Sequence, residues 1–171
     1  QVMAAMGRGE DADSHFQDYL DNDPDRQKII HGVELLRAED TDGARTLLRE
    51  VLQSNPNSIN AMRYMAACHL QAKTNFEDAE ALLRRCTQIA PDYAGAWMTL
   101  GNLCIERNRY VDAIDAYKMV TQLEPKNPES WAGLANAYAV AMYPDESATA
   151  FRTSVELNPN IAGIQMSYGH T

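Results

Sequence analysis

Cysteine, basic residues and long apolar runs are all scarce in this 171-residue sequence. Three cysteines, an odd number, give no disulfide framework and favour a reducing compartment. No apolar stretch approaches the roughly 20 residues that a membrane-spanning helix needs. Lys and Arg number 15 against 24 Asp and Glu, so the formal net charge is −9. Duplex nucleic acid and anionic membranes attract positive charge, and we expect neither as a partner.

The beginning of the chain carries most of the negative charge. Residues 1–24 contain six acidic residues against Arg8 alone. No charged-then-apolar leader follows Gln1, so the sequence predicts no signal peptide and, together with its cysteines, a cytoplasmic protein. We interpret a chain that begins with Gln as a fragment or a processed product. The acidic residues of 10–23 lack the spacing of a calcium loop, which favours a solvated helix face over a cation site.

Motifs that carry catalysis are missing from the sequence. It contains no Gly-Lys-Ser/Thr phosphate loop, no His-Glu-x-x-His and no Cys-x-x-Cys, and no nucleophile stands beside a base. The sequence therefore predicts no catalytic residues, no metal site and no cofactor, and this chain is not expected to be an enzyme by itself.

Cysteine and histidine spacing gives little support to a metal site. Cys68, Cys86 and Cys104 are 18 residues apart, which would suit metal ligands only if their side chains converged. They also fall at positions where the other repeats described below carry packed residues, so we favour three buried core thiols. The four histidines show no ligand spacing, and we expect partial burial for His31 and His69.

Tryptophan and proline recur with a period of about 34 residues. Trp97 and Trp131 are 34 residues apart, and the same interval separates Pro91, Pro125 and Pro159. Such self-similarity is the signature of a repeat array. Smaller landmarks recur in each unit: Gly32, Leu35, Ala44, Leu48 and Pro56; Met62, Met65, Ala66, Ala79 and Leu83; Leu100, Gly101, Ala113 and Tyr117; Leu134, Ala135, Tyr138 and Phe151.

The recurring positions have a physical explanation. Trp97, Gly101 and Cys104, at i, i+4 and i+7, share one face of a helix. We expect this face to meet the second helix of the same unit. Gly101 has no side chain, so the helices can approach closely, and Tyr117 fills the space beside it. Pro125 cannot continue a helix interior and marks the exit of the unit.

The pattern resembles the tetratricopeptide repeat, with Trp–Leu–Gly–Tyr on a first helix and Ala–Phe–Pro on a second. The resemblance implies an all-α solenoid of antiparallel helix pairs stacked into a right-handed superhelix. One extra residue lies in the loop near Thr74. We predict helices at about 25–38, 41–54, 58–72, 76–89, 92–107, 110–123, 128–141 and 144–157. The predicted division is 1–24, a partial preceding repeat with its second helix at about 10–22; 25–58; 59–93; 94–127; 128–161; and 162–171, a truncated first helix of a further repeat.

In proteins of this family the first helices line the concave side, where a peptide or a partner domain binds. Transferring the groove positions of the family to this sequence gives Arg26, Arg37, Asn60, Arg63, Met98, Asn102, Glu106, Asn136 and His170, with apolar residues such as Leu70 and Ile105 between them. The Asn amides could pair with the backbone of an extended peptide, and Arg63 could hold a carboxylate. The bland alternative is that Asn is simply tolerated at these positions.

One subclass of the family clamps a C-terminal carboxylate with a basic residue set. The corresponding positions here are Ile29, Val33, Tyr64, Gly95 and Thr99, and none is basic. The sequence therefore argues against a clamp of that type.

Two segments widen the context. Residues 78–93 and 167–171 are similar to the repeat region that precedes a sulfotransferase domain in some bacterial proteins. We therefore keep two hypotheses: a protein-interaction scaffold, and the non-catalytic N-terminal part of a larger bacterial enzyme, where the array presents the acceptor or mediates dimerisation. The truncated helix, with Ile161, Ile164 and Met166 on its apolar face, could also self-associate.

Overall fold

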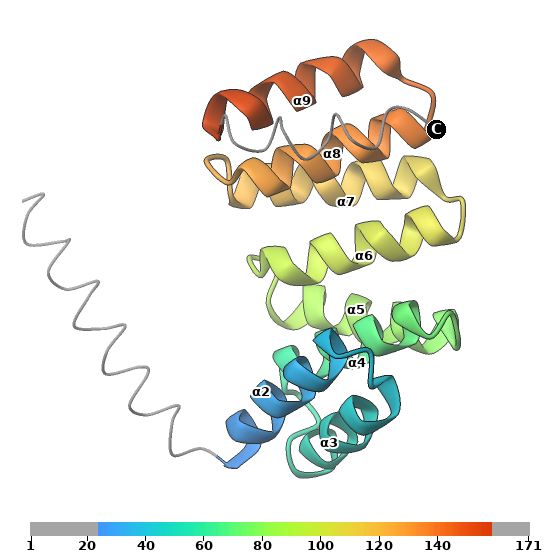
Figure 1. The fold of residues 1–171 in the computed structure, drawn as a ribbon, viewed down its shortest axis with the longest axis vertical. Coiled ribbons are helices and arrows are strands. Elements are labelled where there is room, and N and C mark those ends of the chain that lie inside the picture. The colour runs from blue at the N-terminus through green and yellow to red at the C-terminus, as the bar shows by residue number, and fades with distance from the viewer. Residues whose placement is uncertain (1–23, 159–171) are drawn as a thin grey trace, which may run out of the picture.

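The computed structural model describes residues 24–158 of the chain. Figure 1 shows the helices stacked along the long axis, with α2 at the lower end and α9 at the upper end. Each predicted helix in this part of the chain is confirmed, with ends that differ by two residues or fewer. The predicted partial helices at 10–22 and 162–171 lie outside the described residues. The elements are α2 (Pro24–Arg37), α3 (Thr41–Ser54), α4 (Ile59–Gln71), α5 (Phe76–Ile89), α6 (Ala94–Glu106), α7 (Tyr110–Leu123), α8 (Pro128–Val140) and α9 (Pro144–Leu157).

Successive helices pair across short turns of similar geometry. Each pair, α2–α3, α4–α5, α6–α7 and α8–α9, is joined by a turn containing a residue with positive φ, and Lys73 and Asn75 both have it in the α4–α5 turn. That turn has one residue more than the others, as the extra residue near Thr74 predicts. In the α6–α7 turn, Arg109 N–H donates to the carbonyl of Cys104 at 2.8 Å, which satisfies a carbonyl at the helix end.

Local caps define where several helices begin. The Asn127 side chain accepts a hydrogen bond from the N–H of Glu129 at 2.9 Å, and Pro128 takes the first helical position of α8. Asp40 caps α3 in the same way through the N–H of Gly43. These caps satisfy backbone donors that the helix itself leaves unpaired.

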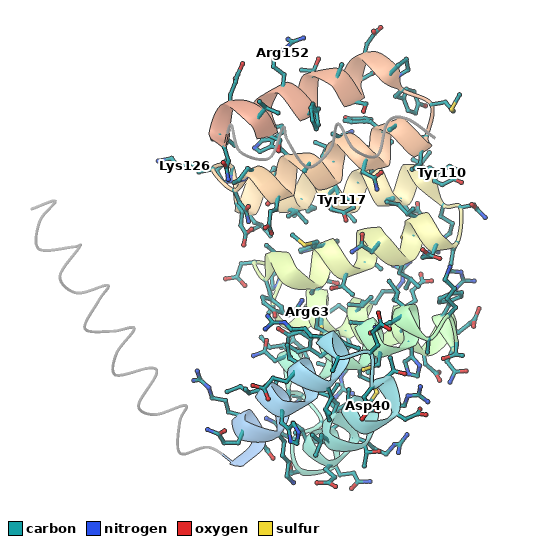
Figure 2. The ribbon with its side chains drawn as sticks, in the orientation of Figure 1. Asp40, Arg63, Tyr110, Tyr117, Lys126 and Arg152 are labelled. Carbon is teal, nitrogen blue, oxygen red and sulfur yellow. The ribbon has the colours of Figure 1, made fainter. Side chains whose placement is uncertain are left out.

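A tyrosine ring between two glycines joins the third and fourth helix pairs. Tyr117 of α7 is 4% exposed, and its ring packs against Gly101 of α6 and Gly133 of α8 (Figure 2 labels Tyr117). A Cβ atom at Gly101 would lie 2.7 Å from Cε2 of the ring, and one at Gly133 would overlap Cε1. Two glycines thus open the space that one aromatic ring fills, as the sequence predicts for Gly101.

The tryptophan–proline spacing has a hydrogen bond behind it. The indole N–H of Trp97 donates to the carbonyl of Pro91 at 2.9 Å, and that of Trp131 donates to the carbonyl of Pro125 at the same distance. Each indole therefore fastens the first helix of a pair to the loop that enters it. Met62 takes the corresponding position in α4 and is fully buried instead.

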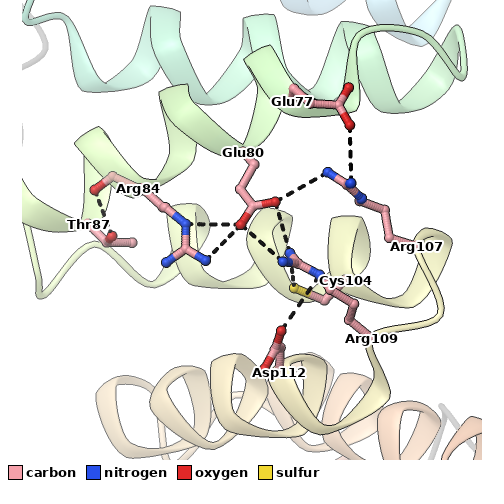
Figure 3. Close-up of polar contacts among 8 residues, drawn as sticks. All are labelled: Glu77, Glu80, Arg84, Thr87, Cys104, Arg107, Arg109 and Asp112. Atoms are coloured by element: carbon pink, nitrogen blue, oxygen red, sulfur yellow. Dashed lines mark hydrogen bonds and ion pairs between the residues drawn. The ribbon is translucent and has the colours of Figure 1, made fainter.

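A carboxylate on α5 collects the arginines of the next turn (Figure 3). Glu80 pairs with Arg84 at 2.7 Å on its own helix and with Arg109 at 3.0 Å on the α6–α7 turn. Arg107 of the same turn lies 3.4 Å from Glu80 and 3.1 Å from Glu77. Burial alone would raise the pKa of Glu80, but the hydrogen bonds from Arg84 and Arg109 outweigh it and hold that pKa below its usual range.

We expect Gly101→Ala and Gly133→Ala each to lower the free energy of unfolding by about 1–3 kcal/mol, because the added methyl group collides with the Tyr117 ring. Gly32→Ala is the matched control, since Gly32 occupies the position of Gly101 in the first unit and its Cβ would meet Leu48 at 3.4 Å, an ordinary contact. Urea denaturation checks the set. If Gly101→Ala behaves like Gly32→Ala, the tyrosine packing described here is wrong.

Glu80→Gln should lower the free energy of unfolding at pH 7 by about 1–2 kcal/mol, since it removes a charged acceptor from three arginines. The folded pKa of Glu80 lies below the unfolded one, so this contribution is present above the unfolded pKa and is lost as the pH falls through the folded pKa. The difference between wild type and variant should therefore shrink in denaturation curves recorded at acid pH.

Glu77→Gln is the control for this series. The Glu77 side chain is 79% exposed and contacts only Arg107 of the cluster, so its loss should cost less than about 0.5 kcal/mol. Equal costs for the two substitutions would contradict the central role of Glu80.

Candidate functional site

The first helices of successive pairs form one continuous face. α2 contacts α4, α4 contacts α6 and α6 contacts α8. Among residues 24–158 the second helices α3, α5, α7 and α9 make no direct contact of similar extent with one another. Helices on the inner side of a curved stack lie closer together than those on the outer side, so the first helices line the inner side.

An open hollow of about 390 Å³ lies on this inner face. The residues that line it come from the C-terminal halves of α4, α6 and α8 and from the turn after α4. We call it the inner hollow; its lining is Leu70, Gln71, Lys73, Asn102, Ile105, Glu106 and Asn136. Three of the nine predicted groove residues, Asn102, Glu106 and Asn136, therefore meet in one place.

The inner hollow combines amide groups, an ion pair and apolar side chains. Lys73 lies 3.6 Å from Glu106, so charge is balanced across one end. Asn102 is not free to turn, because its Oδ1 accepts the Tyr117 hydroxyl at 2.6 Å. Asn136 is exposed, whereas Leu70 and Ile105 are half-buried. The hollow can thus receive an apolar group beside a backbone amide.

The N-terminal end of α4 carries a second group of predicted residues. The Arg63 guanidinium carbon lies 3.9 Å from the centre of the Tyr64 ring and 5.7 Å from that of Tyr93 (Figure 2 labels Arg63). The Tyr93 hydroxyl donates to Oδ1 of Asn60 at 2.8 Å. Burial raises the pKa of Tyr93, although the charge of Arg63 opposes it, so the hydroxyl stays protonated at neutral pH. The rings fix the guanidinium, and its buried Nε has no hydrogen-bond partner among the described residues.

The remaining predicted residues do not join these groups. Arg26 is half-buried and Arg37 exposed, both on α2, and neither lines the inner hollow. Met98 is half-buried and packs against the core cluster of α6 and α7. His170 lies outside the described residues, as do the acidic residues of 10–23.

Sequence reasoning missed three contributors to this face. Lys73 stands in a turn rather than on a helix, so the helical groove positions of the family do not include it. Tyr64 and Tyr93 came up as a non-basic clamp position and as part of a similar segment, without a contact to Arg63. Their proximity depends on how α4 and α6 pack, which the spacing does not specify.

The cysteines are core residues, as the sequence predicts. Cys68 and Cys86 are fully buried and Cys104 is 2% exposed. Burial raises the pKa of Cys68 and Cys86 to about 11, so both thiols stay protonated at neutral pH. Between Pro24 and Asn158, no three His, Cys, Asp or Glu side chains gather as metal ligands.

The histidine expectation is half right. His69 is 7% exposed, but His31 is exposed, because it lies on the outer side of α2 beside the buried Gly32 rather than on the face that meets α3. In the described part of the chain, no helix is both long and apolar enough to cross a membrane.

Comparison with known proteins gives partial sequence relatives. The chain is 28% identical over 105 residues to the human protein O-mannosyl-transferase TMTC3, a match that covers 61% of this chain and 12% of that protein. It is 24% identical over 132 residues to the general transcriptional corepressor ssn6 of Schizosaccharomyces pombe, covering 76% of this chain and 12% of that protein. The chain thus spans about an eighth of the length of these curated relatives.

Solved structures share the fold. TTC0263 of Thermus thermophilus, described as a thermophilic TPR protein, has a TM-score of 0.73 at 20% identity, over 85% of this chain and 83% of that one. A MamA fragment from Desulfovibrio magneticus RS-1 has a TM-score of 0.69 at 24% identity, over 81% and 77%. Two family models described as tetratricopeptide repeat match residues 31–85 and 72–137, which together exceed half of the chain. The chain belongs to the tetratricopeptide repeat family.

Proposed function

We propose that this chain is a protein-interaction scaffold that holds an extended peptide segment, or such a segment of a partner domain, along the inner face of its first helices. The observation that carries the proposal is the inner hollow, where Asn102, Asn136 and an ion pair surround half-buried Leu70 and Ile105. A concave surface of mixed polarity on a rigid stack is a default site for a ligand.

Each part of the face has a role in this proposal. The Asn136 amide donates to and accepts from one peptide unit of the ligand, because its side chain carries both kinds of group. Leu70 and Ile105 receive an apolar side chain. At the other end of α4, Arg63 pairs with a carboxylate, since its guanidinium is already fixed on the Tyr64 ring.

A second proposal concerns the protein around the array. The relatives reported above are far longer than this chain, which covers 12% of each. We propose that the array is the non-catalytic module of a longer chain and presents a substrate protein or a second copy to the rest of it. None of those relatives is named as a sulfotransferase, so a sulfotransferase domain stays a prediction from the sequence alone, as does a cytoplasmic location.

We predict that Asn136→Ala weakens binding of a groove peptide at least about tenfold, through loss of a paired donor and acceptor, while the midpoint of thermal unfolding stays within a few degrees. Peptides selected from a displayed random library against the wild-type chain serve as probes, and fluorescence anisotropy gives the Kd. Asn102→Ala is a poorer test, because it also removes the hydrogen-bond acceptor of the buried Tyr117 hydroxyl.

Gln88→Ala provides the control for this measurement. Gln88 is exposed on α5, a second helix, and lies outside the inner hollow. Its substitution should leave the Kd unchanged. Equal binding by wild type, Asn136→Ala and a further Ile105→Asp variant would place the binding surface elsewhere.

A further inference from the structure

A second hollow lies on the side of the second helices. It has a volume of about 500 Å³, runs between α3 and α5, and has α4 residues at its base. We call it the arginine hollow, because Arg45 and Arg49 of α3 face Arg85 of α5 across it. None of the predicted groove residues lines it, so it is separate from the inner hollow.

The charges around the arginine hollow do not cancel. Three arginines line it against a single carboxylate, Asp78, although the whole chain carries −9. Arg85 donates to Oδ1 of Asn57 at 2.6 Å, which is a neutral partner. Arg45 lies 3.3 Å from Asp42, whose side chain is 89% exposed. No hydrogen bond or ion pair holds the Arg49 guanidinium within residues 24–158. The hollow therefore has a local surplus of about two positive charges, by formal charge at neutral pH.

Two buried nitrogen atoms at this hollow lack partners. His69 of α4 is 7% exposed and lines the hollow, and its Nδ1 has no hydrogen-bond partner among the described residues. Nε of Arg45 is buried and likewise unpartnered. A buried polar group without a partner is costly, and native structures rarely keep one unless water or a ligand satisfies it. Both unsatisfied atoms belong to side chains that line this one hollow.

The protonation state of His69 follows from the same surroundings. Burial lowers its pKa, Arg45 and Arg49 lower it further, and Asp78 opposes them. The imidazole is therefore neutral at neutral pH. An anion placed among these arginines would reverse the electrostatic part of that shift.

We propose that the arginine hollow binds a phosphate monoester, presented as a phosphoserine or phosphothreonine of a partner protein. A phosphate monoester carries nearly two negative charges at neutral pH and three strong acceptor oxygens, which matches the charge surplus and the number of arginines better than a single carboxylate does. The hollow is larger than a phosphate group, and its apolar base of Met65 and Leu82 leaves room for residues beside the modified one.

The residues have distinct roles in this site. Arg49, which has no other partner, supplies the main contact, and Arg45 offers its unpaired Nε. Arg85 contributes from the opposite helix. His69 donates from Nδ1 once that atom carries a proton, so binding should raise its pKa. The site lies outside the inner face, and its failure would leave the proposed groove function untouched.

The test compares three degenerate peptide libraries that differ only in a central phosphoserine, serine or glutamate. Each is titrated against the whole chain at physiological salt. We expect the phosphoserine library to bind at least about tenfold more tightly than the other two. Equal binding of the serine library, or of the glutamate library, would overturn the proposal. Inorganic phosphate serves as a separate probe, and binding as tight as that of the phosphoserine library would overturn the assignment to a peptide.

Two arginine substitutions locate the site. Arg49→Gln should weaken phosphopeptide binding at least about tenfold. Arg152→Gln removes the same charge from the exposed surface of α9, away from the hollow, and should have little effect (Figure 2 labels Arg152). Because Arg49 is also exposed, circular dichroism should show both variants folded. Equal loss in the two variants would mean that only net charge matters, and would overturn the site.

The His69 imidazole gives a readout independent of affinity. Its proton resonances, followed by NMR across the pH range, should report a higher pKa with saturating phosphopeptide than without it. His31, exposed on α2, is the internal control and should not shift. An unchanged His69 pKa in the bound state would place the phosphate elsewhere.

Discussion

The ring of Tyr117 lies between Gly101 and Gly133, and the position of the fourth helix pair depends on this contact. A side chain at either glycine would occupy the volume of the ring. The same tyrosine reaches Asn102 with its hydroxyl, so one residue of a second helix sets the distance between two first helices and orients an amide on the inner face. Packing in the interior and the chemistry of the candidate groove are therefore coupled through a single side chain.

Polar contacts repeat along the stack in step with the apolar ones. The indole groups of Trp97 and Trp131 fasten their helices to Pro91 and Pro125, one period apart. The Glu80 cluster then joins α5 to the α6–α7 turn, where four charged groups share a partly buried space. Such contacts act between neighbouring repeats only, as expected for a solenoid whose stability is a sum of nearest-neighbour terms.

The two faces of the stack offer different chemistry. The inner hollow is balanced in charge and rich in amides, which suits the backbone of an extended peptide. The arginine hollow on the outer face has a positive surplus and two unsatisfied nitrogen atoms, which suits an anion. A scaffold with both surfaces could hold two partners or two parts of one partner, and the separation of the hollows allows each to be tested without disturbing the other.

The sequence by itself determined the period, the helices and the buried character of the cysteines. These follow from local rules, because helix periodicity, prolines and caps depend on residues close together in the chain. It also placed Asn102, Glu106 and Asn136 on one face, through the register of the repeat. Only the tertiary structure decided that Gly133 shares the Tyr117 ring, that His31 is exposed, and that Arg45, Arg49 and Arg85 meet beside His69. Those contacts join helices whose relative distance and rotation depend on side-chain packing, and a repeat pattern gives the order of the helices without giving the contacts between them.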